Sequence, residues 1–435
     1  DLRGAGEQRT DAHGGIISVK QRIMLVGKIS MQNQIRPWRV LAQRDFGLFW
    51  VSLLISAVGN QISSVTVAWQ VYEITNSPLQ LGLIGFFRAL PVIVFSLTGG
   101  VLADRVDRRR LLIVTQGLAM ILAAILGLLT ETGHIQVWHI YAITFIAGAI
   151  NTFEVPARTA MIPNLVAREH LTTAFAMNVT LRQSATLVGP FLGGITLAAV
   201  GIGWSYYINA LSFIGVIVAL VIMRIHESGS AAGEGSALQS MREGLSFVWE
   251  NSAIMGLLVM DTCVGFFGAY KAMMPVFARD LLGVGPTGLG ILLGAPAVGA
   301  LVGSGAVMGM GNPRSKGRLI IFVTLLYTIG LILFALSRSF TLSLIVAFSL
   351  GAFDAVGETL RMTVIQLMTP DHLRGRVQSL VHVFVFGGPL IGQAQVGAAA
   401  SFLGVPGAVI MGGVIGSVVV GLMAKRVSQL RQLET

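Results

Sequence analysis

The sequence predicts an all-α membrane protein whose twelve transmembrane helices form two related bundles of six. Three observations predict this fold. The chain carries too little charge to cover a water-exposed surface, and it contains twelve apolar stretches that are each long enough to cross a bilayer. Its two halves also share glycine, proline and arginine residues at a near-constant spacing.

The composition excludes a water-soluble protein. Of the 435 residues 54% are hydrophobic and 11% are charged, whereas a soluble domain carries about 25% charged residues. Most of the 53 glycines lie within apolar runs, as is common in membrane helices. The single cysteine, Cys263, allows no intramolecular disulfide. The sequence has no Walker loop, no HExxH and no zinc-ligand cluster, so we expect neither an enzyme nor a bound metal or cofactor.

A helix needs roughly 20 apolar residues to cross the hydrocarbon core. The predicted spans of the first half cover residues 46–72, 79–103, 109–130, 136–163, 172–198 and 204–224. Those of the second half cover residues 253–277, 286–308, 318–337, 341–367, 376–402 and 406–424. Before the seventh span, residues 241–251 have the pattern of a short amphipathic helix at the membrane surface.

Basic residues indicate how the chain is oriented. With a cytoplasmic N-terminus, nearly all of them fall in the N-terminal tail, the cytoplasmic connections and the C-terminal end, and only Arg279 and Arg338 fall in connections on the other side. The positive-inside rule therefore places both termini in the cytoplasm. The net charge of +10 reflects this distribution and does not indicate a nucleic-acid partner.

The longest polar interval after the N-terminal tail separates six spans from six. We expect a tail (1–44), a first bundle (45–224), a cytoplasmic linker with the amphipathic helix (225–252), a second bundle (253–424) and a C-terminal tail (425–435). Gly85, Pro91, Gly100 and Arg109 precede Gly290, Pro296, Gly305 and Arg314 by 205 positions. Parallel six-span repeats are typical of secondary transporters, in which the substrate path runs between the halves.

Several motifs resemble the major facilitator superfamily over residues 45–425. Residues 100–109, GVLADRVDRR, are similar to its G-x-L-A-D-R-x-G-R-R loop, with Asp107 in place of the usual glycine. Residues 189–194, GPFLGG, resemble the G-P-x-x-G-G element associated with antiporters. PVFA at 275–278, RGRV at 374–377 and PAR at 156–158 resemble the branch that contains the enterobactin exporter and macrolide efflux proteins.

The resemblance implies proton-driven export of a small molecule across a bacterial inner membrane. At the cytoplasmic boundary, a carboxylate can hold the halves together by bridging to a basic residue or a helix N-terminus. The candidate gate residues are Gly100, Asp104, Arg105, Arg108 and Arg109, and, at the equivalent boundary of the second half, Asp371, Arg374 and Arg376. The alternative to a gate is that these arginines only fix the orientation of the chain in the membrane. Gly189, Pro190, Gly193 and Gly194 form the candidate helix-packing motif, with or without a role in antiport.

Ionisable residues inside spans are costly and mark a solute or proton pathway by default. The candidates are Asp261, Asp354, Glu358, Glu154, Arg182 and Arg88, with Asn60 as a polar lining residue. Asp354, Glu358 and Arg361 share one helix face because they are spaced i, i+4, i+7. Glu154 and Arg182 lie at similar depths in successive spans, so we expect an ion pair there, which is either structural or part of the coupling.

The leading interpretation is a monomeric, multi-pass exporter that exchanges an amphipathic small molecule, such as a siderophore or a macrolide-like drug, for protons. The partners are then the solute, protons and the lipid bilayer. Two alternatives stay open. One is a facilitator or uptake transporter without proton coupling, and the other is a non-transporting membrane sensor on the same fold.

Overall fold

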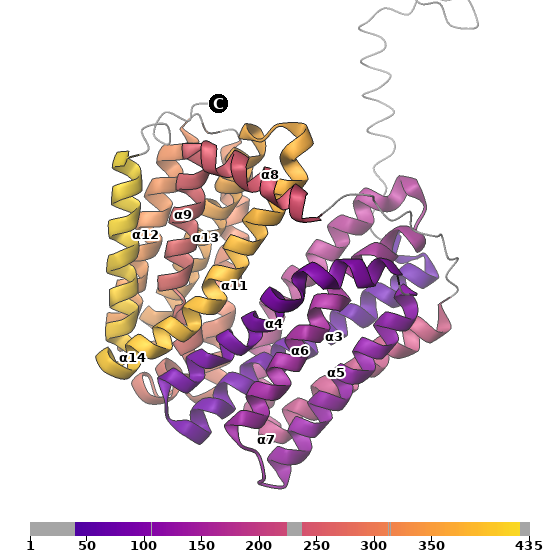
Figure 1. The fold of residues 1–435 in the computed structure, drawn as a ribbon. Coiled ribbons are helices and arrows are strands. Elements are labelled where there is room, and N and C mark those ends of the chain that lie inside the picture. The colour runs from indigo at the N-terminus through magenta and orange to yellow at the C-terminus, as the bar shows by residue number, and fades with distance from the viewer. Residues whose placement is uncertain (1–39, 106, 224–236, 312, 314, 427–435) are drawn as a thin grey trace, which may run out of the picture.

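The computed structural model describes residues 40–426 except for 106, 224–236, 312 and 314; the side chains of 96–105, 237–242, 244, 372, 379, 386 and 426 are also outside the description. Its elements are helical almost throughout (Figure 1). The first group of long helices is α3 (Arg44–Thr75), α4 (Pro78–Arg105), α5 (Arg108–Glu131), α6 (Val137–Met161) and α7 (Leu171–Ile222). After α8 (Ala237–Glu250) come α9 (Ser252–Phe267), the short α10 (Met274–Val276), α11 (Gly285–Met310), α12 (Lys316–Leu336), α13 (Phe340–Met368) and α14 (Arg374–Arg426).

Within the described residues, ten helical segments are long and apolar enough to cross a membrane. Two of them, α7 with 52 residues and α14 with 53, would be about 78 Å long if straight, more than twice the thickness of the hydrocarbon core. Each is in fact two helices joined at a glycine: Gly201 in α7 (φ 84°) and Gly404 in α14 (φ 70°). Residues other than glycine rarely adopt a backbone conformation with such a positive φ. The segments are therefore consistent with the twelve predicted spans.

The seventh span differs from the expected continuous helix over 253–277. Helix α9 ends at Phe267, and a 3₁₀ turn (Tyr270–Met273), the short α10 and a π-helical turn (Phe277–Leu281) complete the crossing. Pro275 lies in the first turn of α10, where its missing N–H leaves no hydrogen bond broken. The break places the backbone around Gly268 beside the cavity that is described below.

The helices form two groups that meet at one end of the molecule and separate toward the other (Figure 1). We call α3–α7 the N-terminal half and α9–α14 the C-terminal half. The end at which they meet, where α3 connects to α4, is the closed end; the opposite end, which carries α8 and the end of α14, is the open end.

Two close helix contacts join the halves near the closed end. Helix α4 packs against the first part of α14, and the first part of α7 packs against α11. Glycines allow the backbones to approach: a Cβ atom on Gly290 would lie 2.7 Å from the Pro190 carbonyl oxygen, and one on Gly397 would lie 2.6 Å from that of Pro78. Because these contacts involve corresponding spans of the two halves, they are related by the internal repeat.

Helix α8 connects the halves at the open end, where the sequence predicts an amphipathic helix. Its Val248 is buried in the same apolar cluster as Ile254 and Leu257 of α9. Leu245 and Trp249 are exposed, Trp249 to 75%. The helix is tied to α14 by an ion pair between Glu243 and Arg376.

Candidate functional site

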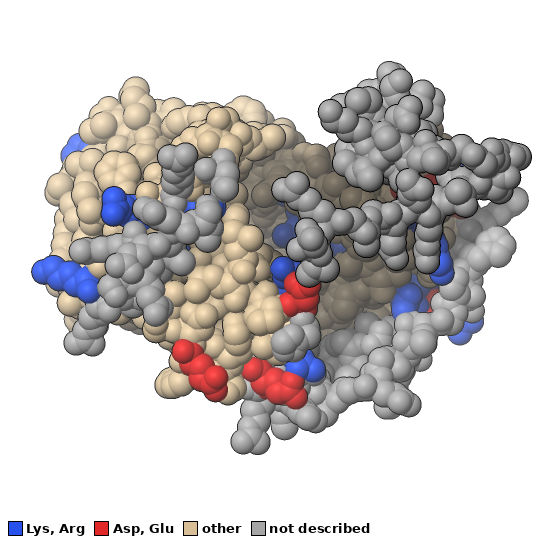
Figure 2. Space-filling view, turned by 90° about the horizontal axis from the view of Figure 1, so that it is seen from above, with Lys and Arg blue, Asp and Glu red and all other residues tan. Residues whose placement is uncertain are grey.

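A cleft opens between the two halves at the open end. Viewed from that end, the molecule is hollowed between them, and charged side chains border the hollow (Figure 2). Several basic side chains at this end have partners in their own half or in α8: Arg108 donates to the Ala160 carbonyl, Arg109 to the Leu220 carbonyl, and Arg376 pairs with Glu243. None of these three contacts joins the two halves.

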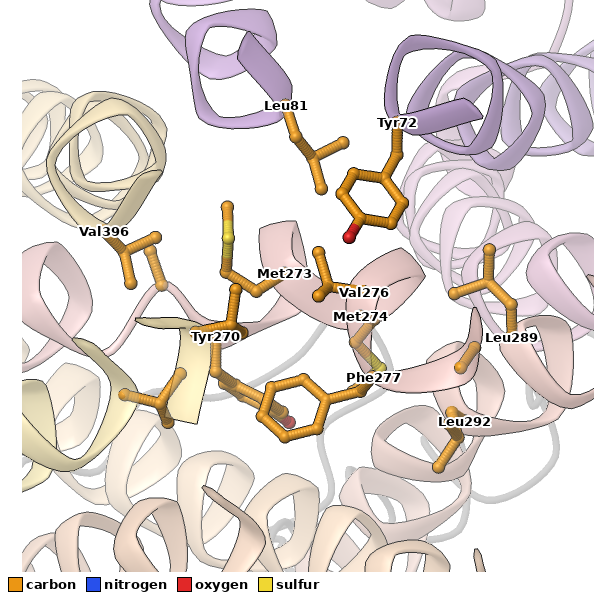
Figure 3. Close-up of a cluster of buried hydrophobic side chains, with 14 of the residues drawn as sticks. Tyr72, Leu81, Tyr270, Met273, Met274, Val276, Phe277, Leu289, Leu292 and Val396 are labelled. Carbon is orange, nitrogen blue, oxygen red and sulfur yellow. The ribbon is translucent and has the colours of Figure 1, made fainter. Parts of the chain in front are cut away.

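The closed end is sealed by side chains from both halves. Val71, Tyr72 and Leu81 of the N-terminal half share one buried apolar cluster with Met273 and Phe277 of the C-terminal half (Figure 3). At its edge the Tyr72 hydroxyl donates a hydrogen bond to the Asp280 carboxylate. The Arg279 guanidinium lies 5.5 Å from the centre of the Tyr72 ring, within range of a cation–π interaction.

A cavity of about 320 Å³ lies in the C-terminal half. Its charged lining consists of Asp261, Lys271, Asp354, Glu358 and Arg361. Its aromatic and polar lining includes Tyr270, Thr324, Tyr327, Phe353 and Gln393. Gln393 is also packed against Gly85 of α4, so the cavity reaches the contact between the halves.

The charged groups are arranged around Arg361, which is buried. Its Nη2 atom lies 2.5 Å from Asp261 on α9 and 4.0 Å from Asp354, seven residues earlier on α13. Asp261 is largely covered, whereas the Asp354 side chain is 52% exposed. One guanidinium therefore faces two carboxylates, one of them deep in the protein and the other accessible from the cavity.

The Tyr270 hydroxyl has no hydrogen-bond partner among the described residues, although the residue is only 2% exposed. Tyr270 follows the break in the seventh span, and its ring packs edge-on against Phe334 at a centroid distance of 5.3 Å. A buried phenol usually finds a partner. Here the hydroxyl oxygen is covered by protein and does not open onto the cavity, although other atoms of Tyr270 line it.

The predicted ion pair between Glu154 and Arg182 is not formed. Glu154 pairs instead with Arg158, one turn further along α6, at 3.6 Å. The prediction failed because successive spans need not be neighbours: α6 packs mainly against α4 and α5, while α7 packs against α3, α5 and α11. Arg182 is exposed on α7 and interacts electrostatically with His382 of α14, in the other half.

Two further polar candidates lie on the N-terminal half. Arg88 is exposed on α4. Its Nη2 atom donates to the Ser64 hydroxyl of α3 at 3.3 Å. Asn60 is also exposed on α3, while its neighbour Gly59 packs against Asn209 and Ser212 of α7.

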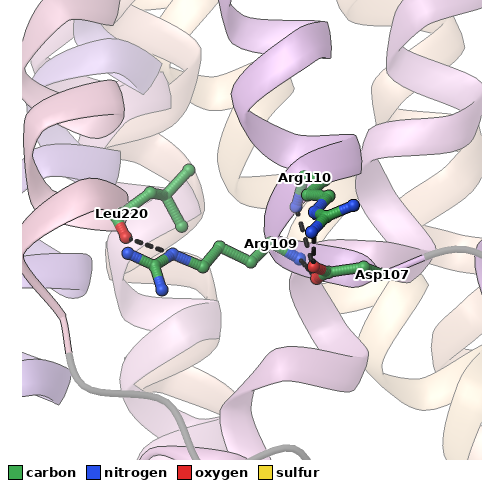
Figure 4. Close-up of polar contacts among 4 residues, drawn as sticks. All are labelled: Asp107, Arg109, Arg110 and Leu220. Atoms are coloured by element: carbon green, nitrogen blue, oxygen red, sulfur yellow. Dashed lines mark hydrogen bonds and ion pairs between the residues drawn. The ribbon is translucent and has the colours of Figure 1, made fainter.

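The loop between α4 and α5 braces the N-terminal half at the open end (Figure 4). Asp107 caps α5 by accepting hydrogen bonds from the backbone N–H groups of Arg109 (2.8 Å) and Arg110 (3.3 Å). Glycine, which the motif usually carries here, has no side chain for this role. Arg109 binds the end of α7 through the carbonyls of Leu220 (2.7 Å) and Val221 (2.8 Å). Gly100, Asp104 and Arg105 lie in the last turns of α4, where side chains are outside the described residues.

At the equivalent boundary of the C-terminal half, Arg374 pairs with Asp371 at 2.9 Å. Arg376 reaches across to Glu243 of α8. In the span-five motif, Gly189 packs against Gln61 and Gly193 against Val65, both on α3. Gly194 instead packs against Gly290 of α11. The motif therefore supports one contact within the N-terminal half and one between the halves.

Comparison with known proteins identifies the family. Residues 35–435 match the family described as transmembrane secretion effector. The chain belongs to this family. It is a transporter of the major facilitator superfamily and a multi-pass membrane protein, not an enzyme.

Curated relatives of this transporter include the enterobactin exporter EntS of Shigella boydii serotype 18, which is 25% identical over 361 residues. The same exporter in Escherichia coli O81 is 26% identical over 361 residues. Each alignment covers 82% of this chain and 86% of the relative.

Solved structures show the same fold. A bacterial homologue of the human lysosomal transporter Spinster, in an inward-facing and unoccupied conformation, matches with a TM-score of 0.72 at 14% identity and covers 89% of this chain and 98% of its own. The nucleoside transporter NupG matches with a TM-score of 0.71 at 11% identity, covering 89% and 99%.

Sequence reasoning missed the residues that seal the closed end. Tyr72 is aromatic in an apolar run, and Asp280 lies next to Arg279 in what reads as a simple loop, so nothing in the pattern shows that they meet. The unpaired hydroxyl of Tyr270 was also missed, because it depends on the break after Gly268. A proline within a span, here Pro275, was the one available signal.

Proposed function

We propose that this transporter is a proton-coupled exporter of amphipathic small molecules that works by alternating access in a bacterial inner membrane. The curated relatives support export, since they are named as enterobactin exporters. A siderophore and a macrolide-like drug are the two solute types that the sequence suggests. The distribution of basic residues supports an orientation with both termini in the cytoplasm.

In this orientation the cleft faces the cytoplasm and the closed end faces outward. The conformation is then the one that loads solute for export. The N-terminal bundle (45–224) and the C-terminal bundle (253–424) are the two bodies that rock against one another. To reach the other conformation, the contact between Tyr72 and Asp280 breaks and the two halves approach at the cytoplasmic end. Arg108 and Arg109 then come near the C-terminal half, and Arg374 and Arg376 come near Asp104 of the N-terminal half.

The arrangement of Arg361 between Asp261 and Asp354 carries the proposal of proton coupling. When both carboxylates are charged, the guanidinium is held mainly by Asp261. A proton on Asp261 removes that attraction and leaves Asp354 as the partner of Arg361. Proton binding can therefore change which helix Arg361 is tied to, α9 or its own α13, and so couple a proton to the relative position of helices.

Efflux from cells tests this function. Cells that produce the protein should accumulate less of a siderophore or a macrolide than cells without it, and a protonophore should abolish the difference. Asp261→Asn and Asp354→Asn should each remove the protonophore-sensitive part of efflux, whereas Glu73→Gln, at the exposed end of α3, should leave it intact. Efflux that is unchanged by the protonophore and by both Asn variants would reject proton coupling.

A further inference from the structure

The N-terminal half carries two arginines within its spans that have no acidic partner. Arg88 on α4 donates to the hydroxyl of Ser64, which is neutral, and Arg182 lies exposed on α7. In the part of the chain that the structure describes, neither forms an ion pair, and Glu154 of this half pairs with Arg158. Charge within a span is costly unless it is paired or faces a water-filled path. Two uncompensated positive charges therefore favour an anionic group near them.

Arg88 faces the C-terminal half. Leu81, Gly85 and Arg88 are spaced i, i+4, i+7, so they lie along one face of α4. Leu81 points into the seal of the closed end (Figure 3), and Gly85 packs against Gln393 of α14. Arg88 is the next residue of this face toward the open end, where the halves separate. It lies about 15 Å along α4 from Pro78, which is near the middle of the hydrocarbon core.

Arg182 borders the same cleft from α7. It lies about two turns before Gly189, which packs against Gln61 of α3. Arg182 is exposed and interacts electrostatically with His382 of α14, which belongs to the other half. Lys and Arg side chains are visible inside the hollow when the molecule is viewed from the open end (Figure 2). The cleft is therefore basic on the side of the N-terminal half.

Between the two arginines, α3 offers neutral polar groups. Asn60, Gln61 and Ser64 lie within about one turn of α3. Ser64 accepts the hydrogen bond from Arg88, and Gln61 packs against α7, on which Arg182 lies. Amides and hydroxyls can donate hydrogen bonds to an oxyanion without neutralising the arginines. This wall therefore combines two cations with neutral donors, which is the chemistry of an oxyanion site.

We propose that this wall of the cleft binds an oxyanion of the transported solute, which is held by the Arg88 guanidinium and attracted by Arg182. The inference rests on the proposed function and names its substrate class: a small organic molecule with an apolar body and a carboxylate or a similar planar oxyanion. A guanidinium binds such a group through two parallel hydrogen bonds. The bond to Ser64 uses one N–H group of Arg88, so donors remain for both.

Equilibrium binding to the purified full-length protein in detergent tests the inference. Two probes of the same shape and different charge are compared by titration calorimetry: the anion 1-naphthoate and the neutral 1-naphthamide. We expect naphthoate to bind at least about tenfold more tightly than naphthamide. The difference should shrink when the concentration of NaCl rises from about 0.05 M to about 0.5 M, because salt screens charges that water can reach.

Variants assign the preference to the two arginines. Arg88→Gln should weaken naphthoate binding about tenfold and leave naphthamide binding unchanged. Arg182→Gln should weaken naphthoate binding by a smaller factor, because this arginine acts through its charge and not through direct bonds. Arg88→Lys should retain part of the preference, since an ammonium keeps the charge but lacks the paired donors. The matched control is Arg338→Gln, an exposed arginine after α12, which should change neither affinity.

Equal affinity for the two probes, or naphthoate binding that is insensitive to both glutamine variants, would overturn the inference. Equal affinity is also what we expect if Arg88 serves only to meet a carboxylate of the C-terminal half when the halves close. Should Arg88→Gln not fold, Arg182→Gln and the effect of salt still decide.

The binding measurement needs no gradient, so it is independent of the transport assay. A protein that prefers naphthoate in this way but shows no protonophore-sensitive efflux would contradict the proposed function and leave the oxyanion site standing. Protonophore-sensitive efflux by a protein that does not distinguish the two probes would contradict the oxyanion site and leave the proposed function standing.

Discussion

At the scale of single residues, charged side chains inside this transporter have different partners in the two halves. Arg361 reaches Asp261 on a neighbouring helix, whereas Arg158, at the corresponding place in the first half, pairs with Glu154 on its own helix. A pair that joins two helices can report their relative movement, and a pair within one helix cannot. This difference is the reason why we propose the coupling chemistry for the C-terminal half.

Removing the Arg361 guanidinium should therefore leave a buried carboxylate without a partner. We expect Arg361→Gln to lower the free energy of unfolding by about 3–5 kcal/mol, because an uncompensated charge is costly inside a protein. The double variant with Asp261→Asn should recover most of this loss. Thermal unfolding of the purified variants measures both effects, and a double variant as unstable as the single one would contradict the assignment.

A second prediction concerns the cap of α5. Asp107→Ala should destabilise the protein by about 1 kcal/mol, because two backbone N–H groups lose their acceptor. Asp107→Asn should cost less, because an amide oxygen still accepts. Thermal unfolding can be compared for the two variants. Identical losses would show that the charge of Asp107, through its ion pair with Arg110, is what matters.

At the scale of helices, contacts between the halves depend on the absence of side chains. Gly290 of α11 leaves no room for a Cβ atom beside Pro190 and Gly194, while Gly305, four turns later on the same helix, has nothing within 4 Å of its own Cβ position. One helix therefore carries a crowded glycine and an uncrowded one, which form a matched pair for mutagenesis.

We expect Gly290→Val to abolish most transport by forcing α11 away from α7, and Gly305→Val to retain it. The export rate is to be compared at equal amounts of protein in the membrane, which excludes effects of expression. A normal rate in Gly290→Val would show that the close approach of α7 and α11 is not needed during the cycle.

Hydropathy and the repeat predict much of this architecture at the level of helices, because each span must satisfy its backbone hydrogen bonds internally and so follows a simple length rule. They do not predict which helices become neighbours, and the expected pairing of Glu154 with Arg182 failed for that reason. For the cavity, the shared helix face of Asp354, Glu358 and Arg361 could be predicted from spacing. The contribution of Asp261 to the same cluster depends on the packing of α9 against α13, which spacing does not encode.

At the scale of the whole molecule, closure at one end and separation at the other are what the proposed alternating-access cycle expects of one of its two conformations. A cross-link across the closed end should stop that cycle. After Cys263, the only cysteine in the sequence, is replaced by Cys263→Ser, the pair Tyr72→Cys and Asp280→Cys allows bridging by a short bifunctional maleimide. We expect the bridged protein to bind solute but not transport it.

The matched controls are the two single-cysteine variants treated with the same reagent, which should keep the activity that they had before treatment. Transport is to be measured in vesicles, and the extent of bridging on a gel after cleavage of a protease site placed in the linker. Continued transport by fully bridged protein would show that the closed end does not need to open.

The two glycine contacts near the closed end would also restrict the proposed rocking of the halves. Gly194 of α7 meets Gly290 of α11, and Gly82 of α4 meets Gly397 of α14. If each half moves as a rigid body and both glycine contacts are kept, the halves can rotate only about the line that joins the two contacts. All four residues on this line are glycines, so no side chain obstructs the proposed swing, and a larger residue at any of them should hinder it whatever solute is carried.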